Sequence, residues 1–172
     1  MTVSKDIESQ DLYDLNALVE VVAKLRDPEA GCPWDIEQDF KSIIPSTLEE
    51  CYELIDTIER EDFAHLEEEL GDLLFQVIFY AEMASERSLF NLTSVIDKLV
   101  NKLIRRHPHV FRESEIIEVD GERSNEKMSS DSVRDLWEKL KVKERKARLF
   151  DSAMDDIPIA LPSLSRAQKV QK

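Results

Sequence analysis

Apolar side chains that recur every three or four residues constrain this chain more than any other feature of its sequence. The longest such stripe runs through residues 66–84, and shorter ones occupy residues 12–25, 48–58, 92–103 and 133–140. This spacing places the apolar side chains on one face of an α-helix. No segment alternates apolar and polar residues as a half-buried strand does. We therefore predict an all-α fold, a helix bundle of four main helices plus C-terminal helices.

Prolines and capping residues mark the expected helix ends. The first helix stops near Asp27, before a proline, and the second begins after Pro45, because proline breaks a helix interior but fits its first turn. Ser46 and Glu49 have the spacing of a capping box at that start. The third helix is expected over residues 63–87, so that only a short polar connection separates it from the second.

The later helices are bounded in the same way. The fourth should run from about Asn91 to His107, and the fifth from Asp131, as its cap, to about residue 148. Gly71 lies inside the third helix, where it costs roughly 1 kcal/mol relative to alanine. Close approach of a neighbouring helix or a ligand would explain that cost, and a tolerated defect is the alternative.

The chain divides into four segments by composition. We expect a flexible N-terminus over residues 1–10, a helical domain over 11–111, a polar loop over 112–131 and a C-terminal helical extension over 132–172. The last helix, which begins at Ser163, has no residue that closes it. We therefore expect the natural protein to continue beyond a truncated extension.

Charge and composition exclude several classes of partner and motif. The formal net charge is −14, and a field of that sign repels nucleic acid and anionic membranes. We thus expect no nucleic-acid partner and no membrane partner, and no apolar run approaches the ~20 residues of a membrane helix. The two cysteines are too few for a disulfide framework, which favours reduced thiols and a cytoplasmic protein. Glycine-rich phosphate loops are absent.

Carboxylates are arranged symmetrically about the turn between the second and third helices. Glu49, Glu50 and Glu53 lie on one helix, and Glu69 and Asp72 on the next. Residues three or four apart share a helix face, and a short connection makes two helices antiparallel neighbours. The pairs 53/69 and 50/72 are both centred on position 61. Each pair should therefore lie at one level of the hairpin.

Four carboxylates at close range repel one another unless a cation binds between them. Oxygen ligands of this kind suit Mg²⁺, with Mn²⁺ as a possible substitute, and Mg²⁺ completes its shell with waters and substrate phosphates. Such a site fits phosphoanhydride hydrolysis. A solvated acidic face is the alternative interpretation, and we assign Glu67 and Glu68 to solvent in either case.

These residues resemble the MazG family of nucleoside triphosphate pyrophosphohydrolases, in the all-α NTP pyrophosphatase superfamily. The superfamily motif reads EExxE, a gap, then ExxD, which here falls on Glu49, Glu50, Glu53, Glu69 and Asp72. Three further blocks are similar to MazG proteins in particular: Leu25-Arg-Asp-Pro-Glu-Ala-Gly-Cys-Pro-Trp-Asp35 with Gln38, Arg105-Arg-His-Pro-His-Val-Phe111, and residues 155–169. The whole resembles the N-terminal MazG domain of tandem members, although only one motif set is present.

The resemblance implies Mg²⁺-dependent hydrolysis of NTPs or dNTPs to a nucleoside monophosphate and pyrophosphate, a house-cleaning of the nucleotide pool. Residues 11–111 would then be the MazG-like pyrophosphatase domain. Its metal ligands would be Glu50, Glu53, Glu69 and Asp72. Glu49 would be a carboxylate just outside these ligands or would help to orient the attacking water. The resemblance also implies a homodimer. Because some tandem members carry one weaker copy, activity of this copy alone stays open.

Other residues are candidates for substrate binding. Lys102, Arg105 and Arg106 lie at the end of the fourth helix, where they could bind a triphosphate or only complement the helix dipole. Trp34, in a proline-containing loop, could stack on a nucleobase, pack in the core or anchor the loop. For His107 and His109 we favour a structural role over a metal site.

Two other functions fit the same residues. One is a relative of narrow specificity that hydrolyses dUTP or phosphoribosyl-ATP with the same metal chemistry. The other is a non-catalytic helical dimerisation or regulatory module that binds a nucleotide without turnover.

Overall fold

The computed structural model describes residues 12–111, 129–147 and 157–171 of the chain. These residues form seven helices and no strand, which confirms the predicted all-α class. The helices are α1 (Leu15–Leu25), α2 (Pro33–Glu37), α3 (Ile44–Glu59), α4 (Phe63–Glu86), α5 (Leu92–Arg106), α6 (Ser130–Ala147) and α7 (Ser163–Val170). The chain divides into two compact units, Met1–Leu99 and Val100–Lys172. The expected N-terminal segment and most of the expected polar loop lie outside the described residues.

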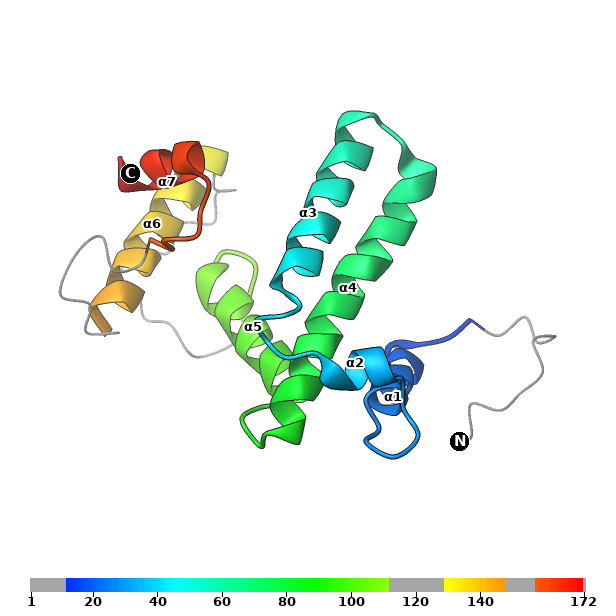
Figure 1. Cartoon of the computed structure of the whole chain (residues 1–172). Helices are drawn as coiled ribbons and strands as arrows, with labels where there is room; N and C mark the ends of the chain where they lie inside the picture. The colour runs from blue at the N-terminus through cyan, green and yellow to red at the C-terminus, as the bar shows by residue number, and fades with distance from the viewer. Residues whose placement is uncertain (1–11, 112–128, 148–156, 172) are drawn as a thin grey trace. The chain divides into compact units, whose positions relative to one another are not determined.

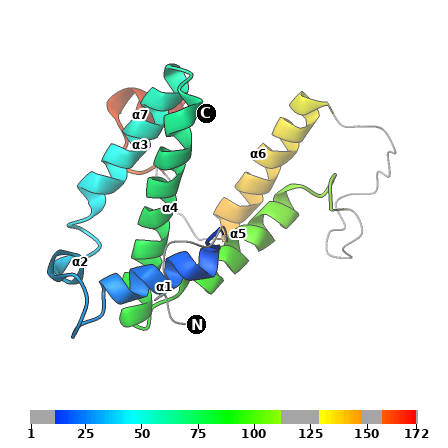
Figure 2. The ribbon, with the colours of Figure 1, turned by 90° about the vertical axis from the view of Figure 1, so that its right-hand side faces the viewer.

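A helical hairpin dominates the N-terminal unit. The helices α3 and α4 run side by side, joined by a three-residue turn, and α1 packs against α4 (Figures 1 and 2). Asp62 caps α4 by accepting a hydrogen bond from the backbone N–H of His65 at 3.4 Å. The short turn makes the two helices antiparallel, which the sequence argument required.

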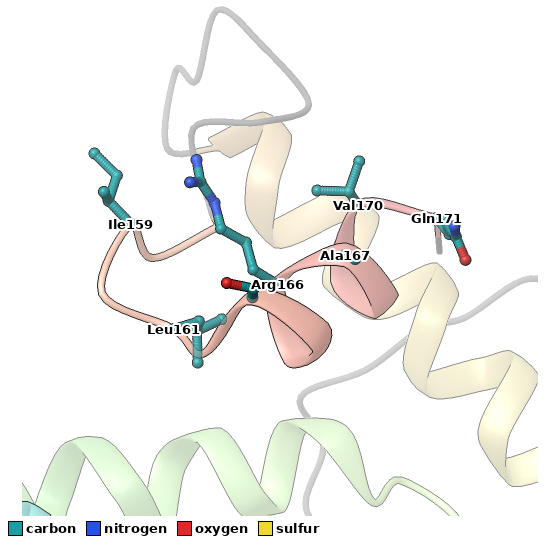
Figure 3. A pocket seen from close by; sticks show the side chains of 7 residues that line it. Ile159, Leu161, Arg166, Ala167, Val170 and Gln171 are labelled. Carbon is teal, nitrogen blue, oxygen red and sulfur yellow. The ribbon is translucent and has the colours of Figure 1, made fainter.

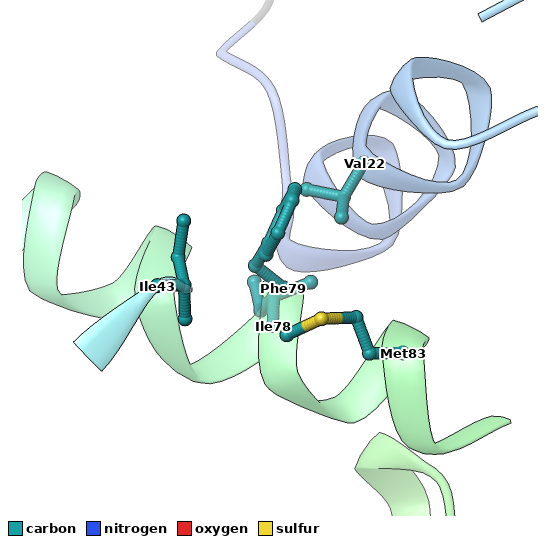
Figure 4. Packing of buried hydrophobic residues seen from close by; sticks show 5 residues of the cluster. All are labelled: Val22, Ile43, Ile78, Phe79 and Met83. Atoms are coloured by element: carbon teal, nitrogen blue, oxygen red, sulfur yellow. The ribbon is translucent and has the colours of Figure 1, made fainter. Parts of the chain in front are cut away.

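The core of this unit lies at the end of the hairpin remote from the turn. Val22 of α1 packs with Ile43, which precedes α3, and with Ile78, Phe79 and Met83 of α4 (Figure 4). Each of these side chains is almost completely buried. The apolar core therefore occupies only one end of the hairpin, and the rest of the α3–α4 interface is available for polar residues.

The start of α3 differs from the sequence prediction. The helix begins at Ile44, its cap residue is Ile43, and no side-chain capping bond is present. The predicted Ser46–Glu49 capping box is therefore wrong. Asp39 instead closes the preceding turn, accepting from the backbone N–H groups of Lys41 at 2.7 Å and Ser42 at 2.9 Å. Proline in the first helical turn already lacks the N–H that a cap would satisfy.

The C-terminal unit contains the end of α5 with α6 and α7. The α6 helix is capped by Ser129, whose hydroxyl accepts from the N–H of Ser132 at 3.2 Å, and not by Asp131 as predicted. A pocket beside α7 is lined by four apolar and three polar residues: Ile159, Leu161, Ala167, Val170, Ser163, Arg166 and Gln171 (Figure 3). No helix among the described residues combines the length and the apolar character that crossing a bilayer requires.

The apolar stripes that identified α3 and α4 do not face the core of the single chain. About half of each side chain, or more, is exposed at Leu48, Tyr52, Ile55 and Ile58 of α3. The α4 helix also exposes Leu70, Leu74 and Val77. Clustered exposed apolar side chains of this extent are typical of interaction surfaces.

Candidate metal centre

Three carboxylates meet between α3 and α4, halfway along the hairpin. Glu50 of α3 and Glu69 and Asp72 of α4 each offer an oxygen atom, and these oxygens all lie within 4.8 Å of one another. Glu50 and Glu69 are partly buried, whereas Asp72 is exposed. The antiparallel hairpin thus brings Glu50 close to Asp72, 22 positions further on, which is one of the two predicted pairs. Of the other predicted pair, Glu69 is in the group and Glu53 is not.

The remaining predicted carboxylates border this trio. Glu53 is exposed and outside the group of three, but its charge raises the pKa of both Glu50 and Glu69. Glu49 is exposed, and its charge also raises the pKa of Glu50. Glu67 and Glu68 are exposed on α4, consistent with their assignment to solvent. The roles of the five motif carboxylates stay predictions.

The electrostatics of the trio are unfavourable without a counter-ion. Desolvation raises the pKa of Glu50, and the charges of Asp72, Glu53 and Glu69 raise it further. Desolvation likewise raises the pKa of Glu69, followed by the charges of Glu53 and Asp72. No described residue forms a salt bridge with any of them. A hard divalent cation is the ligand that such a set of oxygens fits.

The α2 helix presents Trp34, and sequence analysis did not predict this short helix. The Trp34 side chain is 56% exposed, so it is not a core residue. Its carbonyl oxygen accepts a hydrogen bond from the Gln38 side chain at 2.8 Å, and Gln38 in turn accepts from Ser42 at 2.8 Å. This chain of bonds connects the Trp34 segment to the start of α3.

Arg26 fixes the same segment to α4, and sequence analysis missed this residue. Its guanidinium pairs with both carboxylate oxygens of Glu86, at 2.5 and 2.8 Å. It also donates to the carbonyl oxygens of Asp35 and Gln38, at 2.5 and 3.3 Å, and lies 5.1 Å from the ring centroid of Phe79. The side chain is only 6% exposed. Nothing in the spacing of Arg26 and Glu86, 60 residues apart, indicates this contact.

The basic residues at the end of α5 belong to the C-terminal unit. Arg105 and Arg106 both pair with Glu144 of α6, Arg105 at 2.7 Å. These bonds lower the pKa of Glu144 to about 2, with Arg106 the largest cause. Lys102 is partly buried on the same helix. The arginines thus already have a carboxylate partner, and a phosphate would have to compete with it.

Structural contacts hold His107, whereas the Nδ1 atom of His109 is buried without a hydrogen-bond partner among the described residues. The Nδ1 atom of His107 lies 2.7 Å from the carbonyl oxygen of Leu103, and its ring meets Trp137 edge-on at 5.0 Å. His107 and His109 also have their ring centroids 5.7 Å apart. Neither histidine is in the group of potential metal ligands found among the described residues. Cys32 and Cys51 are free thiols.

The fold and the trio define a class, the all-α proteins that place several carboxylates at mid-length of an antiparallel helical hairpin. Residues 38–111 match the family model of the MazG nucleotide pyrophosphohydrolase domain. Over these residues the chain is therefore similar to the MazG domain. The crystal structure of a MazG-related protein from Thermotoga maritima is similar with a TM-score of 0.57 and 27% identity, covering 74% of this chain and 99% of that one.

Curated relatives match nearly the whole chain. A nucleoside triphosphate pyrophosphohydrolase of Escherichia coli K12 is 49% identical over 94% of this chain and 57% of its own length. A nucleoside triphosphate pyrophosphohydrolase/pyrophosphatase MazG of Thermotoga maritima is 41% identical over 90% of this chain and 54% of its own length. The chain spans a little more than half the length of these relatives.

Proposed function

We propose that this chain hydrolyses nucleoside triphosphates, ribo or deoxy, to a nucleoside monophosphate and pyrophosphate with Mg²⁺ or Mn²⁺. One observation carries the proposal: three carboxylate oxygens lie within 4.8 Å of one another inside the region that matches the MazG domain. The names of the Escherichia coli and Thermotoga maritima relatives support the reaction class. The physiological role would be removal of unwanted nucleotides in the cytoplasm.

Glu50, Glu69 and Asp72 would hold the metal, with Glu53 beside them. When bound, Mg²⁺ would neutralise the phosphate oxygens and lower the pKa of a bound water. Glu49 is exposed next to Glu50 and would orient the attacking water and accept its proton. Water adds to phosphorus, the bond between the α and β phosphates breaks, and pyrophosphate leaves.

The remaining predicted residues would bind the substrate. Trp34 has the exposed ring that stacking on a nucleobase requires. Lys102, Arg105 and Arg106 would neutralise the triphosphate, the arginines after leaving Glu144. We also propose a homodimer, supported by the exposed apolar side chains of α3 and α4.

Separate measurement of pyrophosphate and orthophosphate from a panel of NTPs and dNTPs tests the reaction. We expect pyrophosphate without orthophosphate, in the presence of Mg²⁺ and not of EDTA. Glu53→Ala and Asp72→Ala should abolish release while circular dichroism shows unchanged helix content. Glu67→Ala is the matched control, because Glu67 is an exposed member of the same acidic run on α4. Full turnover in both site variants would contradict the proposal.

A further inference from the structure

A buried amide lies one helical turn beyond the carboxylate trio. Gln76 of α4 is only 4% exposed and follows Asp72 by four residues, on the same face of the helix. Thr47 of α3 lies opposite it, three residues before Glu50. The polar α3–α4 interface therefore continues past the trio by one turn, about 5.4 Å along the axis.

Hydrogen bonds fix the orientation of this amide. The Thr47 hydroxyl lies 3.1 Å from the Gln76 side-chain carbonyl oxygen and 3.1 Å from the Tyr80 hydroxyl. Tyr80 is itself held by stacking on Phe40, with ring centroids 6.1 Å apart and planes 9° from parallel. If Tyr80 donates to Thr47, the single hydroxyl hydrogen of Thr47 is shared between the Gln76 carbonyl oxygen and the backbone carbonyl oxygen of Ile43, which also lies at 3.1 Å. The amide carbonyl is thus bound, and the NH₂ group is left over.

Packing does not explain a glutamine at this position. No described residue accepts a hydrogen bond from the Gln76 amide nitrogen. Phe79 and Met83, three and seven positions further along the same stripe, are fully buried apolar residues. Leucine or methionine at position 76 would continue that stripe without needing a polar partner.

The other side of the trio offers no comparable donor. Thr57 of α3 is buried there, but its hydroxyl bonds within the helix to the Leu54 carbonyl at 2.9 Å. Beyond it the turn carries two side-chain pairs, Asp56 with Arg60 and Asp62 with His65. Towards the core, by contrast, Gln76 offers a buried amide one helical turn from Asp72.

We propose that Gln76 is a substrate-binding residue whose amide nitrogen donates to a nucleotide oxygen next to the metal-bound phosphates. That oxygen is a pentose hydroxyl or an α-phosphate oxygen, the acceptors within one turn of the trio. Thr47 and Tyr80 are positioning residues that hold the amide in this orientation. The inference rests on the proposed hydrolysis and adds to it the side on which the nucleoside half of the substrate lies.

The test compares the wild-type chain with Gln76→Leu and Gln76→Glu on one base in three forms: ribo, 2′-deoxy and 2′,3′-dideoxy triphosphate. Gln76→Glu keeps an acceptor for Thr47 and replaces the donor with an oxygen, so it separates the donor role from packing. Thr57→Val is the matched control, because it removes a buried hydroxyl from the same interface on the other side of the trio.

We expect both Gln76 variants to lower kcat/KM for the ribonucleotide by about tenfold to a hundredfold, as the loss of a hydrogen bond to a polar or charged oxygen does. A loss confined to substrates that keep the hydroxyl assigns the acceptor to the pentose. An equal loss on all three assigns it to the α-phosphate. Thr47→Val should show the same pattern, and Thr47→Ser should restore activity.

Two results would overturn the proposal. One is unchanged kcat/KM in both Gln76 variants, and the other is an equal loss in Thr57→Val. Calorimetry of an α,β-methylene triphosphate with Mg²⁺ measures the dissociation constants of the wild-type chain, the Gln76 variants and Thr57→Val without turnover. Absent pyrophosphate release by the wild-type chain contradicts the proposed function. Normal release with unchanged Gln76 variants contradicts only the role of Gln76.

Discussion

At the scale of single residues, Gly31 and Gly71 occupy opposite environments. A Cβ atom on Gly31 would lie 2.5 Å from the carbonyl oxygens of Leu25 and Asp27. A Cβ atom on Gly71, inside α4, would meet nothing within 4 Å. Gly31→Ala should therefore destabilise the chain by about 1–3 kcal/mol.

Gly71→Ala should stabilise the chain by roughly 1 kcal/mol. Equilibrium urea unfolding measures both.

The Gly71 comparison also decides between the two interpretations of that glycine. In the single chain it is a tolerated defect, because no described neighbour approaches it. Gly71→Ala should thus keep full pyrophosphate release. A stable but inactive variant would show that a ligand or a second chain occupies the space.

Glu50 illustrates a conflict between stability and function. Its pKa is raised by desolvation and by the neighbouring carboxylates, so its charged form is unfavourable in the folded chain. The protonated Glu50 side chain therefore contributes stability that is fully present below its ordinary pKa. This stability is lost as the pH rises through the higher pKa that Glu50 has in the folded chain. In EDTA at pH 7, Glu50→Gln should raise the free energy of unfolding by about 0.5–1 kcal/mol. It should also abolish turnover and reduce the stabilisation that Mg²⁺ gives.

Thermal unfolding with and without Mg²⁺ measures this effect. Lower stability of Glu50→Gln in EDTA would show that the trio is not repulsive. Glu67→Gln is the control, because that exposed side chain lies outside the trio and its stability should change little.

Spacing made some site residues predictable and left others hidden. Glu50 and Asp72 are equidistant from a short turn, so helix geometry alone places them together. Gln76 lies on the same helix, but its burial depends on how α3 closes over α4 at Thr47. The Arg26–Glu86 pair joins residues 60 positions apart, and no periodicity encodes such a contact.

At the scale of elements, the Arg26 cluster joins the α1–α2 segment to α4. Arg26→Met removes the donor to the carbonyl oxygens of Asp35 and Gln38 and leaves Glu86, whose side chain is 36% exposed, without its partner. It should therefore lower the free energy of unfolding by about 1–3 kcal/mol. Because the same arginine supports the Trp34 segment, Arg26→Lys should raise KM for nucleotides more than it lowers kcat. Lysine cannot reproduce the bidentate contact and also bind two carbonyl oxygens.

Arg60→Met provides the matched control for the Arg26 variants. Its pair with Asp56 is more than half exposed on both sides, and such surface pairs contribute ~0–1 kcal/mol. Urea unfolding and steady-state kinetics of both arginine variants give the comparison. Equal effects at the two positions would contradict the role assigned to Arg26.

The α5–α6 contact introduces a dependence on acidic pH in the C-terminal unit. The pKa of Glu144 is lowered to about 2 by Arg106 and Arg105. A lowered carboxylate pKa contributes stability that is present above the ordinary value near 4.5 and is lost as pH falls towards 2. Glu144→Gln should lower the free energy of unfolding by roughly 2–3 kcal/mol at pH 7. It should also make that free energy less dependent on pH below pH ~4.5. Trp137 fluorescence in a Trp34→Phe background reports on this unit.

Element boundaries show where local sequence signals fail. The capping box expected at Ser46 is missing because Asp39 and Ser42 already satisfy the turn before α3. The short α2 helix was overlooked because five residues carry no periodicity. Long amphipathic helices such as α4, expected over 63–87 and found over Phe63–Glu86, are instead well determined by their own repeat.

At the scale of the whole molecule, the apolar pattern predicted the helices correctly. It did not predict which part of the protein packs against the apolar faces of α3 and α4. The stripes of α3 and α4 have helical spacing, yet much of their surface is exposed in one chain. The polar interface between the two helices explains why: the inner faces carry Glu50, Asp72 and Gln76, so the apolar residues lie on the outer faces. A second copy of the chain is the occupant that we propose for these faces.

Dissociation of that dimer is the corresponding prediction. Ile55 is about half exposed in the middle of the α3 stripe, and a charge there would be buried unpaired in a dimer that covers the stripe. Ile55→Glu should give a monomer in sedimentation velocity, whereas Glu67→Lys should remain a dimer. Because each chain carries a net charge of −14, added salt should tighten the wild-type dimer by screening like-charge repulsion. A wild-type chain that stays monomeric at high concentration and high salt would leave the apolar faces of α3 and α4 without a second copy to cover them.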